Sequence, residues 1–366
     1  MLETLSLQHF RNYSAQQLAL APGVNLLCGG NGQGKTNLLE SVYYLSHLRS
    51  FRTGKTRELI ALDQAASRVQ AAFFAAGRPQ RMDILLPRQG RVQVRLNGVT
   101  KKKLSECQGV LHTVLFSPED VSLVREGPAR RRQFLDDAIG QLRPRYAAIL
   151  QEYQRVLVHK GRLLRDQNPA FLPLWEDYSA RLCRLGARLL IYRRSYLEEL
   201  APIAAAYHDQ IAPGEELRLS YCPQIRDEMD GDAAALEQAL WRHMRAHYSA
   251  EMGSRACLSG VQRDEVEVFI DGRPARLYAS QGQSRTAALA LKLGERQIIV
   301  KQTGEMPVLL LDDVLSELDE GRQRFVLGQI GGGQSIITCC DGAAAERMCG
   351  GRMFEVERGR ARCVKV

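Results

Sequence analysis

A glycine-rich segment near the start of the chain constrains its fold more than any other feature. Residues 29–36 read Gly-Gly-Asn-Gly-Gln-Gly-Lys-Thr and fit the pattern G-x-x-x-x-G-K-S/T, which is typical of a phosphate-binding loop. A short apolar run over residues 24–28 predicts a buried strand before the loop, and the spacing of Leu38, Val42 and Leu45 predicts a helix behind it. Strand, loop and helix in this order indicate an α/β fold with a nucleotide site.

The residues of this loop have the chemistry that a bound triphosphate requires. Glycines allow consecutive backbone N–H groups to converge on phosphate oxygens, and the helix N-terminus adds partial positive charge. Lys35 is expected to reach the β- and γ-phosphates, and the Thr36 hydroxyl is expected to bind Mg²⁺. A chance glycine-rich turn is the alternative, which the flanking strand and helix disfavour. The predicted ATP-binding residues are Gly29, Gly30, Asn31, Gly32, Gln33, Gly34, Lys35, Thr36 and Asn37.

A second part of the nucleotide site lies far along the chain. Residues 307–313 form an apolar run that ends in Asp312 and Asp313, as a buried parallel strand does when it delivers an acid to a metal site. We expect Asp312 to bind Mg²⁺ together with Thr36, and Asp313 to orient or deprotonate the attacking water. The predicted catalytic residues are Lys35, Asp312 and Asp313.

Two further segments are candidates for contacts across a dimer interface. A Ser-x-Gly-Gln turn before a predicted helix over residues 286–295 offers a hydroxyl, free N–H groups and a helix dipole to a γ-phosphate. An ordinary N-cap at Ser280 or Ser284 is the alternative. After the acidic pair, Ser316 and Asp319 are expected to bridge toward a partner subunit, with a plain helix start as the alternative. The signature-like turn consists of Ser280, Gln281, Gly282 and Gln283.

Most of the chain separates Lys35 from Asp312. This separation is longer than a single nucleotide-binding domain needs between the two motifs. The sequence therefore predicts an insertion and an ATPase core assembled from both ends. Residues 1–117 are expected to form the N-terminal part of ATPase lobe I. Residues 118–278 are expected to form a mainly helical lobe II with a small strand segment, and residues 279–366 the signature helix and the C-terminal part of lobe I.

Periodicity predicts several elements within these parts. Residues 91–96 alternate polar and apolar side chains before Asn97-Gly98, which indicates a hairpin, and residues 265–270 are a further predicted strand. Long amphipathic helices are expected over residues 147–164 and 178–200, separated by Asn168-Pro169 and Pro173. Apolar heptads are nowhere sustained over three or four repeats, so no long coiled coil is expected.

The order of these motifs, together with several shorter strings, resembles the RecF family of the SMC/ABC-type ATPase superfamily. The strings are Phe-Arg-Asn-Tyr at 10–13, Ser-Phe-Arg at 50–52, Phe-Ser-Pro-Glu-Asp at 116–120 and Arg-Arg-Gln-Phe-Leu-Asp at 131–136. The resemblance implies an ABC/SMC-type P-loop ATPase head with an inserted, mainly helical lobe. It also implies that ATP drives formation of a homodimer, in which Ser280 acts in trans on the ATP of the other subunit.

The same resemblance implies a role in DNA metabolism. Members of this family are expected to bind double-stranded and gapped DNA and to help load the RecA recombinase with RecR and RecO. That places the chain in recombination, DNA repair after damage, the SOS response and replication restart. We expect ATP and Mg²⁺ as its cofactors.

Two positions depart from the pattern of transporter-type ATPases. Asp313 stands where those enzymes carry Glu, and Thr338 stands at the switch position where they carry His. The side chain of Asp313 is shorter than that of Glu and should position the attacking water less well, which predicts slow hydrolysis. We therefore expect a weak, DNA-stimulated ATPase whose hydrolysis times the ATP-bound state. The alternative function is an ABC transporter-type ATPase subunit with a membrane partner, and a P-loop kinase is a further alternative that has no use for the turn at Ser280.

The chain carries a formal net charge of +9, which favours an anionic partner. Candidate DNA contacts are Lys101, Lys102 and Lys103, just past the predicted hairpin turn, because lysine and arginine bind phosphates without regard to base sequence. Arg131 and Arg132 are a second candidate pair, with a place near the nucleotide and the lobe interface as their rival role. A solvated face is the alternative for each cluster. No base-reading motif is present, so binding should follow shape and charge.

The nine cysteines form no C-x-x-C pair, and no leader-like segment opens the chain. No apolar run approaches the roughly 18 residues that a membrane span needs. We therefore expect a cytoplasmic protein with reduced thiols and no membrane partner.

Overall fold

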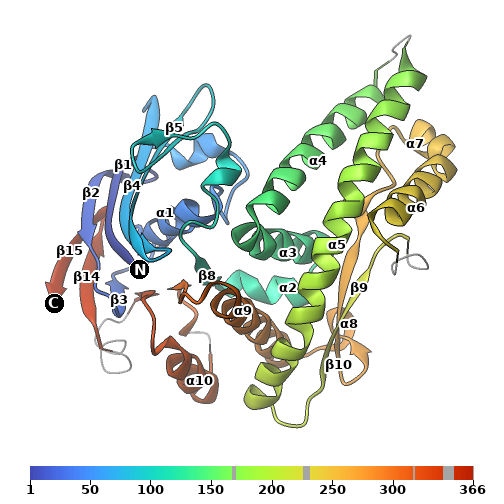
Figure 1. The fold of residues 1–366 in the computed structure, drawn as a ribbon. Coiled ribbons are helices and arrows are strands. Elements are labelled where there is room, and N and C mark those ends of the chain that lie inside the picture. The colour runs from blue at the N-terminus through green and yellow to red at the C-terminus, as the bar shows by residue number, and fades with distance from the viewer. Residues whose placement is uncertain (167–169, 226–230, 316–317, 341–349, 366) are drawn as a thin grey trace. The chain divides into compact units, whose positions relative to one another are not determined.

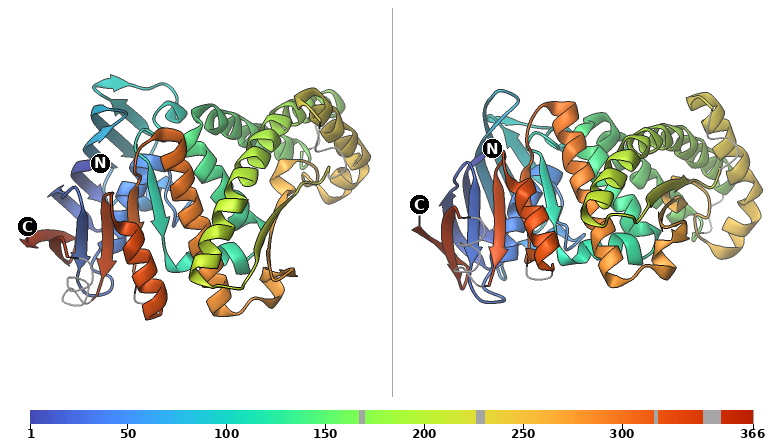
Figure 2. Two further views of the ribbon diagram at one scale, coloured as in Figure 1. Left: turned by 60° about the horizontal axis from the view of Figure 1, so that its bottom comes forward. Right: turned by 90° about the horizontal axis from the view of Figure 1, so that it is seen from below.

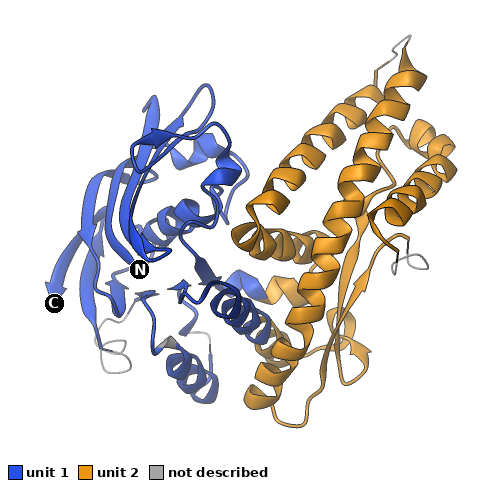
Figure 3. Ribbon diagram, in the orientation of Figure 1, with its two compact units in different colours: residues 1–120, 289–366 blue, residues 121–288 orange. Residues whose placement is uncertain are grey.

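The computed structural model describes residues 1–366 apart from 167–169, 226–230, 316–317, 341–349 and 366. Two compact units make up the described chain: unit 1 comprises residues 1–120 and 289–366, and unit 2 comprises residues 121–288 (Figure 3). Unit 1 is therefore built from both ends of the sequence. The units divide at 120/121 and 288/289, and the lobe boundaries at 117/118 and 278/279 remain predictions.

Unit 1 contains two six-stranded sheets. The first is antiparallel in the order β2-β1-β4-β5-β6-β7. The predicted hairpin at Asn97-Gly98 joins β6 to β7, and both residues have positive φ angles, as such a tight turn requires. Its strands are β1 (Leu2–Phe10), β2 (Tyr13–Ala19), β4 (Ala66–Ala75), β5 (Arg78–Pro87), β6 (Gln93–Leu96) and β7 (Val99–Thr100).

The second sheet of unit 1 positions the nucleotide site. Its order is β15-β14-β3-β13-β12-β8, and all neighbours are parallel except β14 and β15. The predicted strands at residues 24–28 and 307–311 are present as β3 and β12. Because they are parallel members of one sheet, the loop after β3 and the acids after β12 leave it at the same edge. The strands are β3 (Val24–Cys28), β8 (Thr113–Phe116), β12 (Val308–Leu311), β13 (Ser335–Cys339), β14 (Arg352–Glu357) and β15 (Arg360–Lys365).

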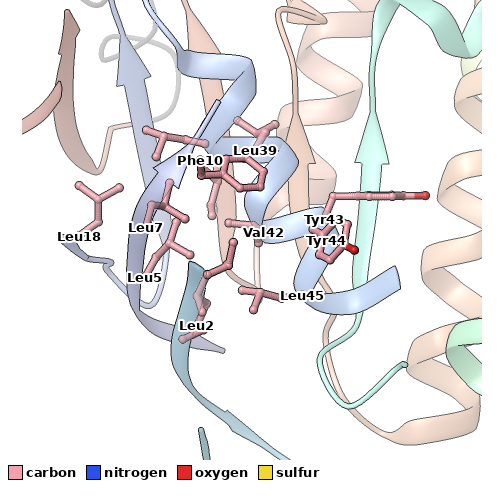
Figure 4. Close-up of a cluster of buried hydrophobic side chains, with 14 of the residues drawn as sticks. Leu2, Leu5, Leu7, Phe10, Leu18, Leu39, Val42, Tyr43, Tyr44 and Leu45 are labelled. Carbon is pink, nitrogen blue, oxygen red and sulfur yellow. The ribbon is translucent and has the colours of Figure 1, made fainter. Parts of the chain in front are cut away.

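Helix α1 (Lys35–His47) fills the core between strands of both sheets, with contacts to β1, β4, β8 and β13. Figure 4 shows Leu39, Val42 and Leu45 of α1 beside the buried side chains of β1. Burial of each such side chain contributes roughly 1.5–3 kcal/mol. Packing on this apolar face thus fixes the N-terminus of α1, and with it the phosphate-binding loop.

Unit 2 is mainly helical, with a small antiparallel sheet in the order β11-β10-β9. The 41-residue helix α5 packs against α4 and α6, and the views in Figures 1 and 2 show it running beside α4. Its elements are α2 (Ser122–Arg125), α3 (Pro128–Leu142), α4 (Pro144–Leu163), α5 (Phe171–Ile211), β9 (Leu217–Cys222), α6 (Ala233–Ala246), α7 (Tyr248–Ser254), β10 (Glu265–Ile270), β11 (Arg273–Pro274) and α8 (Ala275–Tyr278).

Helix α9 (Gln281–Thr303) continues from unit 2 into unit 1, where α10 (Glu320–Ile330) follows. Within the described residues, short 3₁₀ helices span Thr56–Leu59, Leu104–Glu106, Pro118–Val121 and Val261–Arg263.

One expectation about the helices was wrong. Pro173 was expected to separate two helices, but α5 begins at Phe171 and includes it. Proline is tolerated in a first helical turn because the N–H groups there have no intrahelical partner. The helix also continues through Pro202 to Ile211, beyond the predicted end at residue 200.

Candidate functional site

The loop between β3 and α1 has a backbone that only glycine fits at two positions. Gly34 has φ 120°, and a Cβ there would lie 2.7 Å from Nδ2 of Asn12 and 2.9 Å from the hydroxyl oxygen of Tyr13. Gly29 has φ 155°, and a Cβ there would lie 2.2 Å from the carbonyl oxygen of Val356. At both glycines the loop therefore packs tightly against neighbouring segments of the chain.

Lys35 directs its charge into this loop. Its side chain is buried, at 4% exposure, and Nζ donates to the carbonyl oxygens of Gly29 at 2.8 Å and Gly30 at 3.1 Å. No side chain caps the N-terminus of α1, whose first N–H groups lack intrahelical acceptors. An ammonium and a free helix N-terminus on one loop are the donors that a phosphate group needs, so the residues fit a bound triphosphate.

Thr36 and Asp312 meet at the predicted metal position. The Thr36 hydroxyl donates to Oδ1 of Asp312 at 2.9 Å. Burial raises the pKa of the Asp312 carboxyl, while hydrogen bonds from Thr36 and Thr338 act in the opposite direction. A hydroxyl and a carboxylate are the hard oxygen ligands that Mg²⁺ prefers, so this pair fits the predicted ion.

Thr338 connects the two acids, a role that the sequence did not reveal. Its hydroxyl donates to Oδ1 of Asp312 at 2.9 Å and accepts from the backbone N–H of Asp313 at 2.8 Å. Asp313 has φ 50°, a conformation that few non-glycine residues adopt. The carboxylate expected to orient water is thus on a backbone that Thr338 holds in place.

A chain of polar contacts supports the loop from outside. Asn12 donates through Nδ2 to the carbonyl oxygen of Gln33 at 2.9 Å and accepts through Oδ1 from Asn37 at 2.8 Å. Arg52 in turn donates to Oδ1 of Asn37 at 2.8 Å. Asn12 and Arg52 stand out in the sequence only as members of short strings, because their role depends on contacts between distant segments.

A buried carboxylate anchors the same region. Glu40 of α1 is 0% exposed and pairs with the guanidinium of Arg11, whose Nε and Nη2 lie 2.8 and 2.7 Å from its oxygens. The Ser50 hydroxyl also donates to Glu40. These contacts explain why residues 10–13 and 50–52 accompany a phosphate-binding loop: both strings attach to α1.

The signature-like turn lies in unit 2 at the start of α9. The Ser280 hydroxyl accepts from the backbone N–H of Gln283 at 3.1 Å, and Oε1 of Gln283 accepts from the N–H of Ser280 at 2.9 Å. This reciprocal pair is a capping box. Within one chain Ser280 therefore acts as an N-cap, and its predicted action in trans stays a prediction.

The segment after the acidic pair is described only in part. Ser316 lies outside the described residues. Asp319 is the N-cap of α10, with its carboxylate accepting from the backbone N–H of Arg322 at 3.0 Å. The plain helix start is thus the observed role of Asp319 within the chain.

The candidate DNA contacts differ in their surroundings. Lys102 and Lys103 are exposed just past β7, and Lys101 is half-buried. Arg131 is 5% exposed, binds Glu265 through two hydrogen bonds of 2.9 and 2.8 Å and donates to backbone carbonyls. Its donors are used by these internal contacts, and the DNA contact at Arg131 stays a prediction. Arg132 is half-buried and donates to the carbonyl oxygen of Asp264 at 2.6 Å.

The part of the chain that the structure describes contains no helix that is both long enough and apolar enough to cross a bilayer.

Comparison with known proteins agrees with this architecture. The family model described as the RecF/RecN/SMC N-terminal domain matches residues 1–361. A protein of Symbiobacterium thermophilum named DNA replication and repair protein RecF is 38% identical, over 93% of this chain and 91% of its own.

Solved structures give the same result. The structure of the recombination mediator protein RecF-ATP in the RecFOR pathway is 33% identical and superposes with a TM-score of 0.90, over 100% of this chain and 99% of that one. An Smc head domain from Pyrococcus furiosus is 15% identical with a TM-score of 0.55, over 100% of this chain and 96% of that one, and shares the fold.

These matches confirm the predicted fold class, an ABC/SMC-type ATPase head with an inserted helical lobe and no long coiled coil. They also confirm the resemblance drawn from the phosphate-binding loop, the acidic strand and the shorter strings. The chain belongs to the RecF family of DNA replication and repair proteins.

Proposed function

We propose that this chain is an ATP-dependent DNA-binding recombination mediator that dimerises on ATP and hydrolyses it slowly. The observation that carries the proposal is the arrangement of Lys35, Thr36, Asp312 and Thr338 at one edge of the parallel sheet. A relative described as RecF-ATP in the RecFOR pathway supports the same assignment.

The residues of unit 1 divide the work of nucleotide binding. Mg²⁺-ATP, when bound, supplies the γ-phosphate and a divalent charge. Lys35 neutralises phosphate charge, while Thr36 and Asp312 hold the metal ion. Asp313 orients the attacking water, and its short arm together with its fixed backbone keeps turnover slow.

In this proposal Ser280, Gln281, Gly282 and Gln283 of one subunit contact the ATP bound by the other. The turn suits this role because its N–H groups lie at the start of the 23-residue helix α9. Asp319 and Ser316 are proposed to approach the same interface.

The dimer is tested by placing a bulky side chain on the turn. Ser280→Arg should abolish ATP-dependent dimerisation, measured by analytical ultracentrifugation, and leave ATP binding by the monomer unchanged. Ser280→Ala removes the same hydroxyl without adding bulk, so the difference between the two variants isolates the effect of bulk at the turn. Normal dimerisation of the arginine variant would show that the turn does not face a second subunit.

We further propose that double-stranded and gapped DNA is the partner and that Lys101, Lys102 and Lys103 contact its phosphates. Lys102 and Lys103 are exposed beside a hairpin, and none of the three has an acidic partner among the described residues. RecR and RecO are proposed as protein partners, and RecA is proposed as the recombinase that they help to load on DNA.

The central test is fluorescence anisotropy of a labelled gapped duplex at one salt concentration, with and without ATP. We expect tighter binding with ATP, and Lys35→Met should remove the ATP effect because phosphate charge is no longer neutralised. Lys55→Met is the matched control, since Lys55 is an exposed lysine in the same unit. Equal DNA binding with and without ATP would refute the coupling, and no DNA binding at all would favour the transporter-type alternative.

A further inference from the structure

A pocket in unit 2 gathers three arginines from two segments of the chain. Its volume is about 530 Å³, and its lining includes Arg162 at the end of α4, Arg165 just beyond it and Arg255 just after α7. Leu157 and Val158 provide an apolar part of the wall. A concave site with an apolar wall and a few charged groups is the usual form of a binding site.

The three guanidinium groups have no acidic partner within ion-pair distance among the described residues, and all three side chains are exposed. Two other arginines of unit 2 are neutralised: Arg193 pairs with Asp136 at 2.8 Å, and Arg131 pairs with Glu265 at 2.8 Å. Like charges held near one another repel. An anion in the pocket would relieve that repulsion.

A buried ion pair fixes the two segments that provide the arginines. Nζ of Lys160 in α4 lies 2.7 Å from Oε2 of Glu251 in α7, and both side chains are 0% exposed. Glu251 also accepts from the backbone N–H of Leu258 at 2.8 Å, and Lys160 lies over the ring of Trp175 at 4.9 Å. Arg162 and Arg255 are therefore attached to a rigid frame, which lowers the ordering cost of binding.

We propose that this arginine pocket binds the phosphate backbone of a nucleic acid strand. A guanidinium offers parallel N–H donors that match phosphate oxygens, and arginine is preferred where such recognition matters. Three charges in one pocket suit successive phosphates better than a single carboxylate, and Val158, which is 52% exposed, offers an apolar surface to the sugars. The inference rests on the proposed DNA-binding function and gives it a second contact surface, in the helical unit.

The test compares two triple variants of the full-length chain that change the net charge equally. The pocket variant is Arg162→Glu, Arg165→Glu and Arg255→Glu. The control variant is Arg184→Glu, Arg188→Glu and Arg273→Glu, which alters exposed arginines of the same unit outside the pocket lining. Kd for a labelled gapped duplex is measured by anisotropy between 50 and 300 mM salt, and ATP binding and thermal unfolding check that both variants fold.

We expect the pocket variant to weaken DNA binding by about tenfold or more, and to lower the slope of log Kd against log salt by roughly two to three, because each lost phosphate contact lowers it by about 0.9. The control variant should lose much less DNA affinity than the pocket variant. Equal losses in the two variants, or wild-type affinity in the pocket variant, would overturn the proposal.

Two further outcomes separate the hypotheses. If the wild-type chain binds no DNA, the proposed function itself fails. If the pocket variant binds DNA as tightly as wild type but loses affinity for a polyglutamate peptide that wild type binds, the pocket serves an acidic protein partner and the nucleic-acid assignment is wrong.

Discussion

At the scale of single residues, the hydroxyl of Thr338 links the two acids of the candidate site. It donates to the carboxylate that is expected to hold the metal ion and accepts from the backbone of the next acid. A histidine at this position, as in transporter-type enzymes, would present a ring to the site. The threonine instead provides one small, buried oxygen that determines the distance between Asp312 and the peptide of Asp313.

Replacement of Thr338 by valine, which keeps the shape but removes the hydroxyl, should therefore disturb both acids. We expect ATP hydrolysis to fall at least tenfold and the free energy of unfolding to drop by about 1–3 kcal/mol, because the N–H of Asp313 loses its acceptor. Thr338→Ser is the control that retains the hydroxyl. Steady-state hydrolysis and urea unfolding measure the two effects, and identical behaviour of the valine and serine variants would contradict the role.

At the scale of elements, a buried polar network joins helices α3 and α5 to the segment before β10. Arg193 of α5 binds Asp136 of α3 at 2.8 Å and donates to the carbonyl oxygen of Val261 at 2.9 Å. Asp264 accepts from the Tyr221 hydroxyl at 2.7 Å, and its carboxylate lies 3.8 Å from Arg193. Burial raises the pKa of Asp264 to about 6 in spite of that arginine.

This shift has a definite sign for stability. Between about pH 4 and pH 6 the folded chain binds a proton at Asp264 that the unfolded chain does not, so the carboxyl favours folding at low pH and costs stability above pH 6. In wild type the free energy of unfolding should therefore fall by about 1–3 kcal/mol from pH 5 to pH 7 on account of this carboxyl, and Asp264→Asn should remove that fall. Urea unfolding of wild type and variant at both values measures it, with the exposed Asp166→Asn as control. An unchanged difference in the Asp264 variant would contradict the prediction.

At the scale of the whole molecule, the discontinuity of unit 1 is its main property. Strand β3, which leads into the phosphate-binding loop, pairs on one side with β13 and on the other with β14, both from the C-terminal part. The N-terminal segment of unit 1 thus lacks the neighbours that bury Leu26 and Leu27.

We therefore expect a fragment of residues 1–120 not to fold by itself. Its circular dichroism should show no cooperative urea transition, because β3 would have both edges unpaired. Addition of residues 289–366 as a separate chain should restore a transition, and the full-length chain is the control. Cooperative unfolding of the 1–120 fragment alone would show that the C-terminal strands are dispensable.

The sequence predicted those parts of the site that depend on local order. The glycines of residues 29–34 and the apolar run before Asp312 can be recognised from their spacing. The structure has strand β3 before the glycines and strand β12 before Asp312. The roles of Asn12 and Thr338 were not predictable, because each depends on contacts across more than twenty residues of chain. The burial of Arg131 was not predictable for a related reason, because a basic run does not indicate that one of its members pairs with Glu265.

The pairing of β3 with β13 and β14 also has a consequence in time. During translation the glycine loop is made before residues 121–288, yet the strands on both sides of β3 are made after them. Residues 121–288, which are continuous, are complete well before then. A chain whose synthesis has not yet reached β13 and β14 therefore lacks both neighbours of the strand that leads into the phosphate-binding loop.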